Sequence, residues 1–129
     1  MNNYSLKTSS QENFTEVVEK TKSLLEEQGF GVLTNIDIKQ KIKNKIGSNI
    51  DDYRIIGACN PEFAYNVLKE NKNIGLFLPC SVVVYKDGKQ TFVEIMKPTF
   101  TDQFFESGKI AEVSEKVEEQ LQYVISNIN

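Results

Sequence analysis

Apolar and polar residues alternate with a period of two in several segments of the chain, and this pattern predicts β-strands. The predicted strands are residues 4–8, 30–38, 53–59, 81–85 and 90–96. Asp87-Gly88 stands between the last two strands and favours a two-residue hairpin turn, in which Val84 would pair with Thr91. Alternation would then place Cys80 on the core face of the hairpin and Phe92 on the opposite face.

Other segments repeat apolar residues three and four positions apart, which is the spacing of a helix that buries one face. Ser9 and Glu12 have the spacing of a capping box that would begin the first helix, and Gly29 would end it. In the strand after this helix, Val32, Thr34, Ile36 and Ile38 would share one face. A shorter second helix follows, with Ile38, Ile42 and Ile46 on one stripe and Gly47 at its end.

Two further helices complete the pattern. Asn60 is a favourable N-cap, and Pro61 stands at the first helical position, where its missing N–H costs nothing. The last and longest helix is expected after Gly108. The order strand, helix, strand, short helix, strand, helix, hairpin, helix predicts an α+β fold. We expect a sheet of about five strands, helices mainly on one face, and a single domain over residues 1–129.

Composition and charge narrow the class of protein. Apolar residues make up 40% of the 129 residues, charged residues make up 26%, and the net charge is −3. This balance predicts a globular, cytoplasmic domain without a nucleic-acid or membrane partner. The second helix carries four lysines, which would form a phosphate or acidic-partner surface or, as we favour, a solvated helix face: Lys39, Lys41, Lys43 and Lys45.

The two cysteines mark the candidate site, because each stands close to a proline at the end of a predicted strand. The candidate binding residues are Cys59, Asn60, Pro61, Glu62, Pro79 and Cys80. We expect the cysteines to approach each other as a pair of thiols, since the cytosol disfavours a disulfide. The start of the helix at Pro61 would lower the pKa of Cys59, whereas burial would raise it.

The chain has no histidine, which removes Ser-His-Asp and Cys-His catalysis and the usual imidazole metal ligands. Three hypotheses remain: a ligand-binding or thiol site around Cys59 and Cys80, a dimeric interaction module, and a cysteine-dependent enzyme with Glu62 as base. The enzyme is the weakest of these, because nothing replaces the histidine. Two thiols also fall short of a closed metal site unless a dimer supplies two more. We therefore expect no cofactor and no metal, and an unidentified small ligand at most.

Three blocks of this sequence resemble the domain-of-unknown-function family 302. They are Gly29–Thr34, Arg54–Glu62 with its Ala-Cys-Asn-Pro motif, and Gly75–Tyr85 with its Leu-Pro-Cys motif. The resemblance covers roughly Leu6 to Phe100, and a long final helix is also expected of the family. It implies a small α+β domain that commonly stands alone in prokaryotic proteins, and it brings no established activity. Ser81 departs from the family, which usually has asparagine there.

A homodimer is the expected assembly. The hairpin face with Val83, Tyr85 and Phe92 offers more apolar surface than the first helix can easily cover. The final helix would add spare apolar positions at Ile110, Val117 and Leu121. Two-fold association is the commonest way for a small domain to cover such a surface. The alternative is that the final helix folds back over the hairpin and leaves a monomer.

Overall fold

A five-stranded antiparallel sheet organises the computed structural model, which describes residues 2–129. The strands are β1 (Ser5–Ser10), β2 (Gly31–Asp37), β3 (Tyr53–Cys59), β4 (Cys80–Asp87) and β5 (Gln90–Met96). Their order across the sheet is β1-β5-β4-β3-β2, which the sequence pattern did not provide. The α+β class and the five strands are confirmed.

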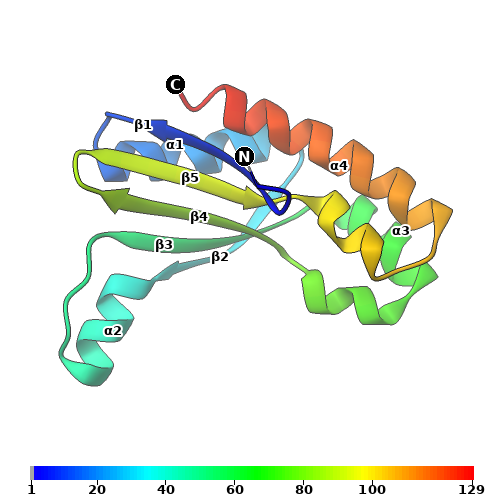
Figure 1. Ribbon diagram of the computed structural model, residues 1–129, viewed down its shortest axis with the longest axis horizontal. Helices are drawn as coiled ribbons and strands as arrows, with labels where there is room; N and C mark the ends of the chain where they lie inside the picture. The colour runs from blue at the N-terminus through cyan, green and yellow to red at the C-terminus, as the bar shows by residue number, and fades with distance from the viewer. Residues whose placement is uncertain (1) are drawn as a thin grey trace.

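The helices differ in what they cover (Figure 1). They are α1 (Phe14–Glu27), α2 (Ile38–Ile46), α3 (Pro61–Glu70) and α4 (Gly108–Ser126), with 3-10 helices η1 (Lys72–Phe77) and η2 (Pro98–Gln103). α1 and α4 contact the sheet, and their buried residues join Val82, Val84 and Ile95 in one core. α2 stands apart from the other helices and contributes no buried residue. The segment after Asn71 forms η1.

The final helix leaves no spare apolar stripe. Ile110, Val117 and Leu121 are buried within the chain, because α4 packs on η2, α3 and the edge formed by β1 and β5. The prediction that these positions add exposed apolar surface is therefore wrong. Within residues 2–129, no helix is long and apolar enough to cross a membrane.

A β-bulge in β2 changes which side chains share a face. Val32 pairs with Ala58 and Thr34 pairs with Gly57, so one extra residue, Leu33, stands between them. Val32 packs against the core, whereas Thr34 and Ile36 lie on the opposite face. The prediction that Val32, Thr34 and Ile36 share one face is therefore wrong, because strict alternation does not allow for an inserted residue.

The β4–β5 hairpin is also shifted relative to the sequence prediction. Val84 pairs with Val93 instead of Thr91, and Asp87 pairs with Gln90. The two turn residues are thus Gly88-Lys89, and Gly88 has the positive φ of +64° that this turn requires. Because the shift is an even number of residues, every side chain keeps its predicted face, and Cys80 packs against the core.

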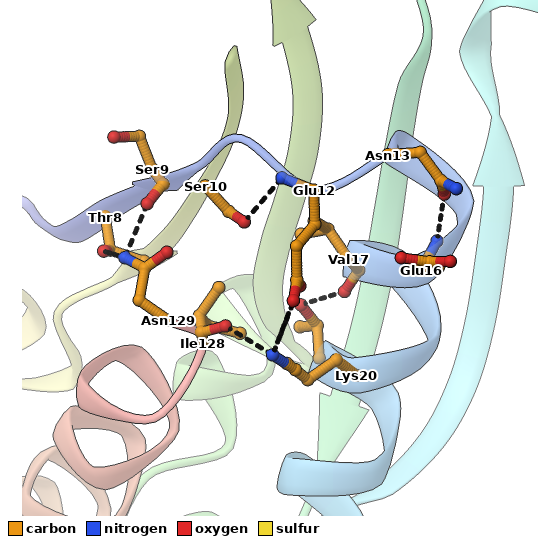
Figure 2. Close-up of polar contacts among 11 residues, drawn as sticks. Thr8, Ser9, Ser10, Glu12, Asn13, Glu16, Val17, Lys20, Ile128 and Asn129 are labelled. Carbon is orange, nitrogen blue, oxygen red and sulfur yellow. Dashed lines mark hydrogen bonds and ion pairs between the residues drawn. The ribbon is translucent and has the colours of Figure 1, made fainter.

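The first helix begins later than the capping-box pattern predicted (Figure 2). Asn13 is the N-cap, and its side chain accepts a hydrogen bond from the Glu16 amide at 2.8 Å. Ser9 and Glu12 precede the helix, and the Glu12 amide donates to the Ser10 hydroxyl. The Glu12 amide therefore bonds within a turn instead of a capping box, and Asn13 caps the helix.

The last residues of the chain are tied back onto β1 and α1. Asn129 Nδ2 donates to the Ser9 carbonyl at 2.6 Å, and Lys20 Nζ donates to the Ile128 carbonyl at 2.9 Å (Figure 2). Ile128 is fully buried. Contacts between residues about 108 to 120 positions apart thus fix α4 across the sheet.

Candidate functional site

A pocket lies where β3 and β4 meet the helices α3 and α4 and the short helices η1 and η2. Its wall is mainly apolar and includes Phe30, Ala58, Cys59, Asn60, Phe63, Ala64, Val67, Ile74, Phe77, Leu78, Cys80, Met96, Pro98, Thr101, Val113, Ser114 and Val117. The space open to the centres of water-sized molecules is about 60 Å³. The pocket is therefore narrow, and it suits a single ring or a short chain better than a large cofactor.

Both cysteines line this pocket, but the cysteine pair expected from the sequence is absent. Each is a free, half-buried cysteine. Cys80 pairs with Ala58 across β3 and β4, so Cys59 comes one residue further along β3. Successive residues of a strand point to opposite faces, and the two side chains therefore leave their strands in different directions.

Burial decides the protonation state of both thiols. It raises the pKa of Cys59 above the ordinary value of 9.0. Burial and, to a smaller extent, the nearby Cys59 raise the pKa of Cys80 to about 11. The pKa of Cys59 is therefore not lowered as the start of α3 would favour, because burial withdraws the side chain from water and disfavours the thiolate. Both side chains are neutral thiols at pH 7.

The start of α3 is closed by its own cap. Asn60 Oδ1 accepts hydrogen bonds from the amides of Glu62 at 3.1 Å and Phe63 at 3.4 Å. The Ala64 amide donates to the Asn60 carbonyl, and Pro61 has no N–H to offer. These bonds occupy the amides that could have held an anion. Pro61 and Glu62 are exposed and do not line the pocket.

Pro79 lies on the other side of the same wall. It borders a wide depression that it shares with Thr34, Gly57, Leu76 and Ser81. A Cβ atom on Gly57 would stand 2.8 Å from Pro79 Cγ and 2.5 Å from Thr34 Oγ1. The ring of Pro79 therefore fits here because Gly57 has no side chain. This contact sets how the residues just before Cys80 approach those just before Cys59.

An aromatic cluster adjoins the pocket through Phe77, which lines it. Phe77 stacks on Phe104 with ring centroids 5.6 Å apart and meets Phe105 edge-on at 5.9 Å. Phe104 remains 55% exposed. Leu76, which precedes Phe77 in the chain, is 87% exposed. Phe77 therefore links the pocket wall to an aromatic cluster that remains partly exposed to solvent.

Sequence reasoning found Cys59, Asn60 and Cys80 but missed the opposite wall of the pocket. Thr101 and Ser114 line it, and both are buried. Ser114 stood beside Val113 on the apolar stripe of the final helix, and a serine there was the one available signal. No group of three or more metal-binding side chains occurs within the described residues.

Comparison with known proteins adds the family. The model of a domain of unknown function, DUF302, matches residues 6–128, which is almost the whole chain. The chain belongs to the DUF302 family. A crystal structure of an uncharacterized conserved DUF302 protein from Bacillus stearothermophilus is similar over 97% of this chain and 98% of that chain, with 27% identity and a TM-score of 0.89. No curated protein matches the chain.

This result confirms the family that the sequence resembles and extends the resemblance along the chain. The match continues from β1 to the end of α4, so the long final helix belongs to the DUF302 domain. The family carries a fold without an assigned activity. Any function for this DUF302 domain therefore has to be argued from its site.

Proposed function

We propose that this DUF302 domain binds a small, mainly apolar ligand in the pocket between Cys59, Cys80 and α4. The observation that carries the proposal is the pocket itself. Apolar and aromatic side chains from α3, η1 and α4 converge there on a few polar groups, among them the two thiols and the Ser114 hydroxyl. A largely apolar cavity with few, fixed polar groups is the usual form of a small-molecule site.

The state of the thiols favours binding over catalysis. A cysteine nucleophile acts as the thiolate, and burial raises the pKa of both cysteines. Glu62, the base considered from the sequence, is exposed at the start of α3 and lies outside the pocket wall. Cys59 and Cys80 therefore act as small, polarisable wall groups and as weak hydrogen-bond donors.

The size and lining of the pocket set the class of ligand. A single aromatic ring or an alkyl chain of a few carbons would pack against Phe63, Phe77 and Val117, and a hydroxyl or N–H on it would face Ser114 or a thiol. A charged ligand would meet no opposite charge in this wall. Its desolvation would then be uncompensated.

The test is a titration with three uncharged probes: phenol, benzyl alcohol and 1-hexanol. Nuclear magnetic resonance follows the methyl groups of Val67, Val113 and Val117, which line the pocket. We expect saturable shifts for at least one probe, with a dissociation constant in the micromolar to millimolar range that suits so small a ligand.

A filled pocket provides the matched variant. Ala64→Leu adds a larger side chain to the wall from α3, and helical propensity is nearly unchanged. Ala111→Leu makes the same change at a half-buried position of α4 outside the pocket. Binding should be lost in the first variant and kept in the second. Unsaturable shifts for all three probes, or equal binding by both variants, would refute the proposal.

A further inference from the structure

α2 touches β3 and pairs its Lys39 with Asp52 at 3.6 Å, but its apolar stripe is not buried by its own chain. Strands β2 and β3 are antiparallel neighbours, and a two-residue turn would suffice to join them. The chain instead inserts α2 and a loop between them, and α2 buries none of its residues. Ile38, Ile42 and Ile46 form its apolar stripe, and the side chain of Ile46 is 73% exposed. A nine-residue helix is marginal without packing, so this stripe needs a surface to cover.

The sheet offers such a surface on the side away from the core. We call it the open face and define it by Ile55, Val83, Tyr53, Tyr85, Phe92 and Glu94, which are all only half-buried. The three rings form one row across β3, β4 and β5: Tyr53 stacks on Tyr85 at 5.4 Å, and Tyr85 stacks on Phe92 at 5.5 Å. The row is flat, apolar and already ordered.

The charges on the open face are neutralised within it. Tyr85 Oη donates to Glu94 at 2.7 Å, Ser5 Oγ donates to the other carboxylate oxygen at 2.9 Å, and Lys7 lies 3.8 Å from Glu94. Burial alone would raise the pKa of Glu94, but these groups together lower it. A partner that covers the open face therefore meets no isolated charge.

We propose that the open face binds α2 of a second copy of this chain in a two-fold dimer. Each copy supplies one helix with an unburied apolar stripe and one half-buried sheet face, which is the self-complementarity that a two-fold axis requires. The helix leaves the sheet from the β2 edge of this same face, since Ile36 in β2 pairs with Ile55. The two surfaces are thus continuous.

Charge supports a second copy as the occupant. α2 carries four lysines and no acidic residue. The whole chain carries −3, so the remainder of the chain carries −7 once the +4 of α2 is set apart. On a helical wheel Lys39 and Lys45 flank the isoleucine stripe, where their stems would cover the aromatic row. Lys7 already lies 5.0 Å from the Phe92 ring centroid, so the row accepts a cation.

The size of the two surfaces is also sufficient. The nine residues of α2 and the outward side chains of five strands together approach the roughly 20–30 residues a side of a stable interface. The dimer proposed here does not involve the pocket between Cys59 and α4. Its failure would leave the proposed ligand site untouched.

The experiment is sedimentation velocity at micromolar concentration with one variant on each side of the interface. Ile46→Glu changes an exposed residue of α2, so folding of the single chain does not depend on it. Phe92→Glu changes the open face. Asn44→Glu adds the same charge to α2 on the side away from the stripe and serves as the control.

We expect a wild-type dimer of twice the 14.7 kDa chain mass. Ile46→Glu and Phe92→Glu should each weaken it by at least about 100-fold, since the two-fold axis buries each new charge twice. Asn44→Glu should remain a dimer, and near-ultraviolet circular dichroism should show intact tertiary packing in all variants. A wild-type monomer, a persistent Ile46→Glu dimer, or equal dissociation of the Asn44→Glu control would each overturn the proposal.

Cross-linking tests the placement of α2 directly. In a dimer mixed from ¹⁴N and ¹⁵N chains, amine-reactive links between Lys45 and Lys7 should join a light chain to a heavy chain. Lys7 lies at the edge of the open face, above the Phe92 ring. Links found only within one chain would show that α2 does not cross to the partner.

Discussion

Gly57→Ala tests the contact that joins the two cysteine-bearing segments. The new Cβ would stand 2.5 Å from Thr34 Oγ1 and 2.8 Å from Pro79 Cγ, both inside van der Waals contact. Thr34 can rotate at the sheet edge, whereas the Pro79 ring is rigid. Overpacking of this kind costs about 1–3 kcal/mol, and the gain from restricting the unfolded chain returns about 0.4–1 kcal/mol. We expect a net loss of about 1–2 kcal/mol in the free energy of unfolding.

Urea unfolding at a fixed protein concentration measures this loss, and a fall in melting temperature of about 3–10 °C should accompany it. Gly108→Ala is the control, because nothing lies within 4 Å of a Cβ there. The double variant Gly57→Ala with Thr34→Ala should recover only part of the loss, since the proline contact remains. A Gly57→Ala protein as stable as the wild type would refute the packing of Pro79 on this glycine.

Two further predictions concern the site. Cys80 keeps its proton to about pH 11 when folded but loses it near 9.0 when unfolded, so the free energy of unfolding should fall as pH rises between these values. The effect is at most about 3 kcal/mol, and the difference between wild type and Cys80→Ala isolates it; parallel pH curves would contradict it. Asn60→Ala leaves two amides of α3 without their acceptor and should cost about 1 kcal/mol in urea unfolding. Asn60→Asp keeps the acceptor and should lose less; equal losses would exclude the cap as the cause.

Much of the site was readable from local sequence. Asn60 and Pro61 fixed the start of α3, and the alternation in β4 placed Cys80 on the core face, because both signals depend on neighbours in the chain. The opposite wall was not readable. Thr101 and Ser114 reach the pocket only because η2 packs on α4 and α4 packs on α3, and no local pattern encodes that approach.

The acidity of Cys59 shows the same division. Its position before a helix was clear from the sequence and favoured a lower pKa. Its burial depended on side chains from other parts of the chain, and burial determined the direction of the shift. Likewise, Asp87-Gly88 predicted a hairpin, but the observed register differs from the predicted one by two residues. Local sequence does not include the pairing of β5 with β1 and of β4 with β3, which also has to be satisfied.

The sequence by itself determined the elements of this protein and the faces of its hairpin strands β4 and β5. Apolar periodicity, caps and glycines act within a few residues, so they specified five strands, the main helices and the family. Tertiary structure alone decided the strand order, the bulge at Leu33 and the closing of the pocket by α4. It also left the apolar stripe of α2 unburied and the side chains of the open face half-buried. These features depend on contacts between distant segments. The energy of such contacts is shared among many residues, so no single stretch of the chain predicts them.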